Sequence, residues 1–105
     1  MPERFAIQLI PAFPPVLEDL AVVVEELVSA ERVEEVIRQA GGRTLIDMRL
    51  FDMYRGEQIG AGKKSLAYSL TYQDPERTLT DEEVAKIRQR IIRSLEQEFN
   101  ARLRS

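Results

Sequence analysis

Hydrophobic residues define three short segments with the character of β-strands. Residues 19–24 are rich in branched side chains, which favour strands. Segments 44–54 and 65–72 alternate between two faces, the period expected of a strand that buries one side. In the last segment Leu66, Tyr68, Leu70 and Tyr72 oppose Ser65, Ala67, Ser69 and Thr71. The third strand is therefore predicted to carry one face of small side chains.

The alternation in segment 44–54 slips once. Ile46, Met48 and Leu50 share one phase, but Phe51 and Met53 follow in the other. A β-bulge inserts one extra residue and reverses the phase. We therefore predict a bulge near Leu50–Phe51, which returns Phe51 and Met53 to the core side and turns Asp52 outward.

Two segments show helical periodicity. The first begins with a cap at Ser29 and ends at Gly41–Gly42, because glycine accepts the left-handed conformation after a helix. The second begins at a capping box of Thr80 and Glu83, flanked by the hydrophobic pair Leu79 and Val84. Its apolar stripe is Val84, Ile87, Ile91, Leu95 and Phe99. Residues 102–104 are predicted to add a short last strand.

The order strand, helix, strand, strand, helix, strand predicts an α+β domain. We expect a ferredoxin-like βαββαβ sandwich over residues 19–105, with two helices on one face of an antiparallel sheet. The four prolines within residues 1–18 predict an extended lead-in or linker, which indicates a piece of a longer chain. Helices would cover Leu20, Val22, Val24, Leu66, Tyr68 and Leu70. The open face would show Ala21, Val23, Ser65, Ala67, Ser69 and Thr71, which are small enough to let a ligand lie close.

Composition narrows the function. The 105 residues include no Cys and no His, which excludes cysteine zinc sites, imidazole metal sites and histidine-dependent nucleophiles. The net charge of −3 argues mildly against coating nucleic acid by charge alone. Residues 84–105, however, hold six basic and two acidic side chains. This excess fits either a solvated helix face or a phosphate-facing flank.

Two motifs have alternative interpretations. The sequence Gly60–Ser65 lacks the first glycine and the final Ser or Thr position of a phosphate-binding loop, and it leads into a strand, so a hairpin loop with two lysines is favoured. Asp52 lies in an otherwise apolar strand, where a carboxylate is unfavourable unless it has a hydrogen-bond partner or serves a function. It is either a solvated edge-strand residue or an acceptor for a base amino group.

Four blocks in order resemble one known family. They are Phe13–Val16 with Asp19–Val24, Leu50–Gly56, Gly62–Tyr68 and Asp74–Val84. Together they are similar to the ferredoxin-fold anticodon-binding domain that ends the beta subunit of bacterial phenylalanine–tRNA ligase. The chain departs from that family at Glu18, where the family usually has arginine.

The resemblance implies a module that binds phenylalanine tRNA within a cytoplasmic α2β2 ligase, an aminoacyl-tRNA synthetase. Catalysis, ATP, magnesium and phenylalanine would belong to the alpha subunit, and this domain would hold no catalytic residue, metal or cofactor. Neither a membrane nor DNA is expected as a partner. The implied anticodon contacts are Ala21, Asp52, Ser65 and Phe99. Phosphate contacts are expected at Lys63, Lys64 and Arg77. The alternative is a ferredoxin-like protein-interaction or small-ligand regulatory module without RNA binding.

Overall fold

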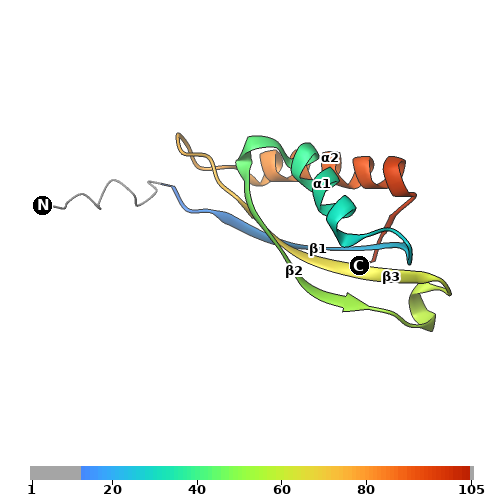
Figure 1. Cartoon of the computed structure of the whole chain (residues 1–105). Helices are drawn as coiled ribbons and strands as arrows, with labels where there is room; N and C mark the ends of the chain where they lie inside the picture. Colours follow the sequence, from blue (N-terminus) through green and yellow to red (C-terminus); the bar gives the residue numbers. More distant parts are fainter. Residues whose placement is uncertain (1–12, 105) are drawn as a thin grey trace, which may run out of the picture.

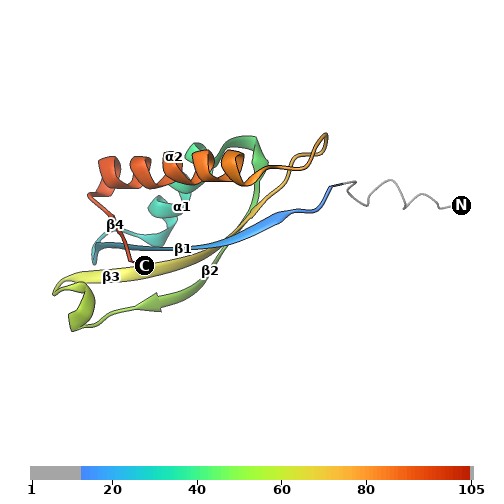
Figure 2. The same ribbon diagram turned by 180° about the vertical axis from the view of Figure 1, so that it is seen from behind.

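The computed structural model describes residues 13–104. Its elements are β1 (Val16–Glu25), α1 (Ala30–Gly41), η2 (Gly42–Thr44), β2 (Leu45–Tyr54), η3 (Glu57–Ile59), β3 (Lys63–Tyr72), α2 (Asp81–Phe99) and β4 (Arg102–Leu103). The sheet has the order β2-β3-β1-β4 and every pairing is antiparallel. Both helices lie on one side of it, as seen from the front (Figure 1) and from behind (Figure 2). The predicted ferredoxin-like sandwich is confirmed.

The helix boundaries follow from the predicted caps. Ser29 accepts a hydrogen bond from the Arg32 backbone N–H, and Gly42 ends α1 at a φ of 70°. At the start of α2, the Thr80 hydroxyl accepts from the Glu83 N–H and the Glu83 carboxylate accepts from the Thr80 N–H. These bonds satisfy backbone donors that a helix terminus otherwise leaves unpaired.

The core lies between the sheet and the helices. Large side chains from the covered face of β1 and β3 pack against the stripes of α1 and α2. The fully buried members include Val22, Val33, Ile37, Leu66, Tyr68, Leu70, Ile91 and Leu95. Each leucine or isoleucine of this set stabilises the fold by roughly 2–5 kcal/mol relative to alanine. The core therefore fixes the sheet as a rigid support for its other face.

The predicted bulge is present, but one of its consequences is wrong. The ladder between β2 and β3 skips from Leu50–Tyr68 to Asp52–Ala67. Phe51 and Met53 nevertheless remain 54% and 48% exposed. They stay exposed because the helices do not cover this part of the sheet: β2 is an edge strand that curves away from the helices toward its Tyr54 end (Figure 1). A second irregularity, between Leu45 and Asp47, had no signal in the sequence pattern.

The first strand is longer than predicted. It begins at Val16, three residues before the expected start at Asp19, and pairs with β3 along its whole length. Most of the predicted lead-in, residues 1–12, lies outside the described residues. Within residues 13–104, neither helix has the length and apolar character needed to cross a membrane.

Candidate nucleic-acid interface

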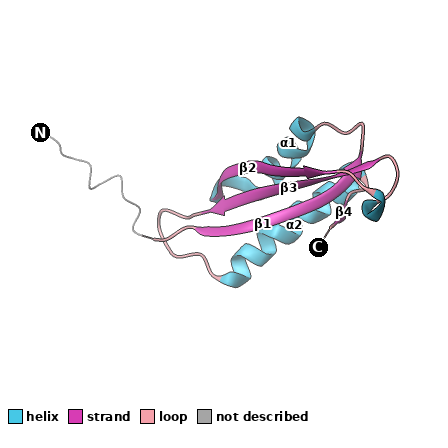
Figure 3. Cartoon of the chain, turned by 90° about the horizontal axis from the view of Figure 1, so that it is seen from below, coloured by secondary structure: helices cyan, strands magenta, loops and turns pink. Residues whose placement is uncertain are grey.

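The sheet face away from the helices is arranged in rows set by strand register. Residues directly opposite each other in an antiparallel ladder share a face. One row is Asp52, Ala67 and Ala21, and the next is Tyr54, Ser65, Val23 and Arg102. The row on the other side is Arg49, Ser69 and Asp19. Figure 3 views this surface, called the open face below, with the helices behind it.

Three of the predicted contact residues lie on this face. Asp52 is exposed on β2, and Ala21 is half-buried in the same row on β1. Ser65 belongs to the adjacent row, so Ala21 and Ser65 point the same way, as predicted. The bulge turns Asp52 toward them. Their placement on one face is thus confirmed, and their contact with RNA stays a prediction.

One end of the open face is covered by the protein's own chain. Val23 and Ser65 are each 1% exposed, and Ala67 is buried as well. The prediction that these three side chains lie open is therefore wrong.

The cover comes from η3 and the C-terminal segment. Ile59 of η3 is buried, yet it lies outside the cluster between sheet and helices. Arg102 lies in the row that contains Val23. Its guanidinium donates a hydrogen bond of 3.1 Å to the Ile59 carbonyl. Figure 3 shows η3 and β4 at the same end of the sheet. Beneath this cover the Ser65 hydroxyl oxygen is buried with no hydrogen-bond partner in the described part of the chain.

Phe99 does not lie on the open face, which corrects the implied stacking role. It ends the apolar stripe of α2 and is buried in the core cluster between helices and sheet. The Arg32 guanidinium lies over its ring, 5.2 Å from the centroid. A base resting on the sheet cannot reach this ring because the sheet itself lies between them.

The predicted phosphate contacts divide among three environments. Lys63 forms an ion pair with Glu25 at the covered end of the open face. Lys64 is opposite Val24, so its side chain leaves the sheet on the helix side, where it is buried. Arg77 lies in the loop before α2 and pairs with Asp74 and Glu83. The three cations do not form one surface.

Glu18 lies on the helix side of the sheet. Its carboxylate pairs with Arg88 of α2 and accepts a hydrogen bond from the Tyr72 hydroxyl at 3.2 Å. Burial, with Glu18 beside it, raises the pKa of Tyr72 above its ordinary value. Glu18, the residue that departs from the family pattern, therefore makes its contacts within the domain. It places no negative charge on the open face.

Sequence reasoning missed three residues of the open face. Tyr54 is half-buried in the row of Ser65, Arg49 is exposed in the row of Ser69, and Arg104 carries its guanidinium over the Tyr54 ring, 4.7 Å from the centroid. Tyr54 could have been found, because it follows Asp52 by two residues on the same face. Arg104 had no such signal, since its contact joins residues 50 positions apart.

The described residues offer no metal site. No group of three His, Cys, Asp or Glu side chains within residues 13–104 is placed to hold an ion. The open face presents small side chains, flat groups and several exposed carboxylates, among them Asp19, Asp47 and Asp52, a set suited to stacking and hydrogen bonding.

A four-stranded antiparallel sheet with two helices behind it and this partly open front defines a ferredoxin-like domain. The model of the ferredoxin-fold anticodon binding domain family matches residues 11–104, and the chain belongs to that family.

Three similar proteins are all phenylalanine–tRNA ligase beta subunits. The chain is 48% identical over 102 residues to the phenylalanine–tRNA ligase beta subunit of Geobacillus kaustophilus. It is 50% identical over 99 residues to the same subunit of Halalkalibacterium halodurans and 48% identical over 95 residues to that of Clostridium tetani. These matches cover 97%, 94% and 90% of the chain but only 13%, 12% and 12% of the relatives.

Proposed function

We propose that this domain binds the anticodon stem-loop of phenylalanine tRNA as part of a phenylalanine–tRNA ligase beta subunit. The observation that carries the proposal is that Ala21 and Asp52 share one row on the open face of a domain of the anticodon-binding family. Small side chains beside a carboxylate allow a flat base to approach the sheet closely while its edge meets an acceptor.

In the proposed mechanism the open face contacts the bases of the anticodon loop. Unstacked loop bases lie against the sheet between the Asp52 row and the Ser69 row. Asp52 accepts a hydrogen bond from a base amino group, because an ionised carboxylate is only an acceptor. Arg49, exposed on β2 in the Ser69 row, supplies positive charge for a phosphate next to it. Base contacts give the specificity and phosphate contacts give the position.

The proposal places the catalytic chemistry of the parent enzyme outside this domain. In this proposal the domain binds no cofactor, while ATP, magnesium and phenylalanine bind to the alpha subunit of a cytoplasmic α2β2 ligase. The identity of the relatives as beta subunits supports the subunit assignment. The domain contributes to aminoacylation by holding the anticodon end of the tRNA.

A protein-interaction role has one observation in its favour. Strand β2 is a sheet edge with exposed apolar side chains, among them Ile46, Phe51 and Met53. Such an edge favours contact with another polypeptide. The edge and the open face are different surfaces, so this role is compatible with RNA binding. It replaces RNA binding only if the domain has no affinity for the stem-loop.

The decisive experiment is a fluorescence-anisotropy titration of the 105-residue chain with a labelled anticodon stem-loop of phenylalanine tRNA. The matched control is the same stem-loop with its three anticodon bases replaced. We expect a preference of roughly tenfold or more for the phenylalanine anticodon, the discrimination expected from specific base contacts. Equal affinity for both loops, or no binding at low salt, would overturn the proposed function.

A further inference from the structure

Strand β2 leaves one side of its backbone without a strand partner in the described part of the chain. It pairs only with β3, and the sheet order ends at β2. The strand at the other edge, β4, has two residues, whereas β2 has ten. A long edge strand offers a row of backbone donors and acceptors to another chain. The sheet can therefore be extended most readily at β2.

The same strand carries four exposed apolar side chains. They are Ile46, Leu50, Phe51 and Met53, each between 36% and 54% exposed. A groove lined by Arg38 of α1 and by residues 45–48 runs beside the start of the strand, so α1 does not close over this edge. A polypeptide that covers β2 would remove apolar surface from water, which favours association.

Two opposite charges on β2 indicate what that polypeptide is. Asp47 and Arg49 are exposed, lie on the open face and flank Met48 in the regular stretch between the two bulges. Neither forms an ion pair with another side chain of residues 13–104. An antiparallel second copy of β2 centred on Met48 brings each Asp47 opposite the Arg49 of the other copy. The strand is thus complementary in charge to itself.

Other registers of two β2 strands are less favourable. Centring the pairing on Asp47 or on Arg49 places like charges directly opposite each other, which is destabilising. Centring it on Leu50 runs the ladder into the bulge between Leu50 and Asp52. A slip by one residue places paired side chains on opposite faces of the sheet. The charge pattern and the bulges together select the register centred on Met48.

We propose that two copies of this chain pair through their β2 strands, antiparallel and centred on Met48, in a two-fold symmetric dimer. At each end of the short ladder, Leu50 of one copy comes opposite Ile46 of the other, so apolar side chains flank the two ion pairs. The two-fold axis is perpendicular to the sheet. Both open faces therefore lie on the same side of the dimer, and the helices lie on the other. This inference goes beyond the proposed function and does not depend on RNA binding.

The first test measures the mass of the 105-residue chain by sedimentation equilibrium, without RNA. We expect a reversible change from the 12.1 kDa monomer to twice that mass. The change should fall between about 1 μM and 1 mM, because the interface is small. A monomer mass at every concentration would overturn the proposal and leave the β2 edge to a different polypeptide. Growth beyond a dimer would also overturn it, because each copy has one β2 strand to pair.

The second test reverses the charges. Asp47→Arg and Arg49→Asp should each weaken dimerisation by at least about tenfold, because both ion pairs become like-charge pairs. A mixture of these two variants should form a heterodimer, since every opposing pair is again unlike. The double variant, Asp47→Arg with Arg49→Asp, should dimerise with itself for the same reason.

Matched controls reverse exposed charges away from the edge. Asp19→Arg lies on the open face of β1, and Arg93→Asp lies on α2. Each should leave dimerisation unchanged, which separates pairing at β2 from an effect of net charge. If the two β2 variants stay monomeric both when mixed and when combined in one chain, the proposed register is wrong. A variant that merely unfolds would not regain dimerisation on mixing, and circular dichroism identifies it.

The third test marks the symmetry axis by cross-linking. The chain has no Cys, so a single introduced cysteine reports one position. Met48→Cys places a thiol at the axis, and mild oxidation should give a disulfide-linked dimer on a non-reducing gel. Met53→Cys is the control, because Met53 is the more exposed side chain but lies five residues from the axis. Cross-linking that is more efficient at position 53 than at position 48 would overturn the proposed pairing.

Discussion

Asp52 owes its direction to one extra residue in β2. The bulge between Leu50 and Asp52 places the carboxylate opposite Ala67 on the open face, and Leu50 opposite Tyr68 on the covered face. The side chain is exposed on an edge strand, so its charge needs no partner for stability. A side chain that points outward and does not stabilise the fold is free to contact a base.

Asp52→Asn should reduce anticodon discrimination without destabilising the domain. The amide keeps the shape but replaces one acceptor oxygen with a donor, so the preference for the phenylalanine loop should fall by about 1–3 kcal/mol. Anisotropy titrations with the intact and altered loops measure it. Asp47→Asn, on the same strand and face two rows away, should leave discrimination unchanged. Equal losses of anticodon discrimination in both variants would indicate an effect of negative charge in general. Asp52 would then not be a specific base contact.

Alternation in the sequence sufficed to predict which residues share a face. It placed Ala21 and Ser65 together because side-chain direction has a two-residue period, and the predicted bulge added Asp52 to them. It could not predict the burial of Ser65, since the cover comes from Ile59 and Arg102, which meet only in the folded chain. Phe99 is the opposite case. Its helical spacing already placed it in the core stripe, and the resemblance alone gave it a role on the other side.

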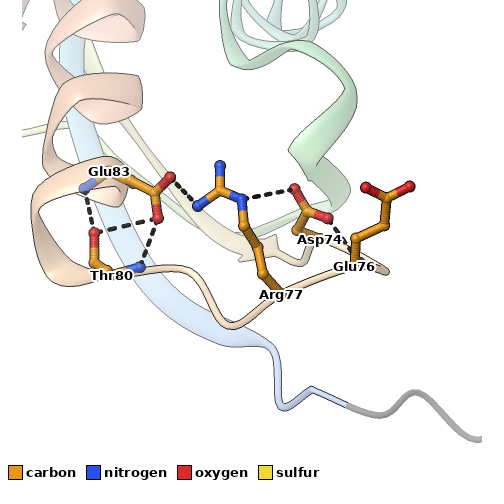
Figure 4. A network of polar contacts seen from close by, with 5 residues as sticks. All are labelled: Asp74, Glu76, Arg77, Thr80 and Glu83. Carbon is orange, nitrogen blue, oxygen red and sulfur yellow. Dashed lines mark hydrogen bonds and ion pairs between the residues drawn. The ribbon is translucent and has the colours of Figure 1, made fainter.

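The start of α2 is the element with the most complete local network. Thr80 and Glu83 bond each other's backbone N–H groups, and Arg77 joins Glu83 to Asp74 across the preceding loop (Figure 4). Asp74 also accepts from the Glu76 N–H at 2.8 Å. The network ties the β3–α2 connection to the helix end. Sequence spacing predicted the capping box but not the part played by Arg77.

Thr80→Ala should lower the free energy of unfolding by about 1 kcal/mol, because the Glu83 N–H loses its acceptor at the helix terminus. Urea unfolding followed by circular dichroism measures the change. The control is Thr78→Ala, an exposed threonine in the same loop, which should be close to neutral. Similar losses at both positions would mean that the loop as a whole, rather than the cap, stabilises this end of α2.

Glu83 should make the stability of α2 depend on pH. The hydrogen bond from the Thr80 backbone, followed by the bond from Arg77, lowers the pKa of Glu83 below its ordinary value of 4.5. A lowered pKa in the folded state adds stability above pH 4.5, and this stability is lost as the pH falls through the folded value. Glu83→Gln keeps the capping geometry and removes the charge.

The stability difference between the unchanged domain and Glu83→Gln should thus be present at neutral pH and shrink in acid. Unfolding curves recorded for both proteins between neutral pH and strong acid give this difference, in which the other carboxylates cancel. A difference that stays constant as the pH falls would show that the Glu83 charge contributes nothing, and would leave the cap as a neutral hydrogen-bond effect.

On the scale of the whole molecule, the basic excess of residues 84–105 is divided between two surfaces. Arg102 and Arg104 reach the open face, while Arg88 pairs with Glu18 within the domain. The others, Lys86, Arg90 and Arg93, follow one side of α2 opposite its buried stripe and border a shallow groove. Charge alone would thus direct a nucleic acid to the helices, whereas shape and small side chains direct it to the sheet.

These two surfaces give different salt dependences. If RNA lies on the sheet, Arg49→Gln should weaken binding and lower the slope of log affinity against log salt by roughly 0.7, the value for one phosphate of a single strand. Lys86→Gln combined with Arg93→Gln removes two charges from the outer side of α2 and should change neither quantity. Titrations at several salt concentrations measure both. The reverse result, with Arg49→Gln silent and the α2 pair reducing the slope, would place the RNA against the helices and make Ala21 and Asp52 bystanders.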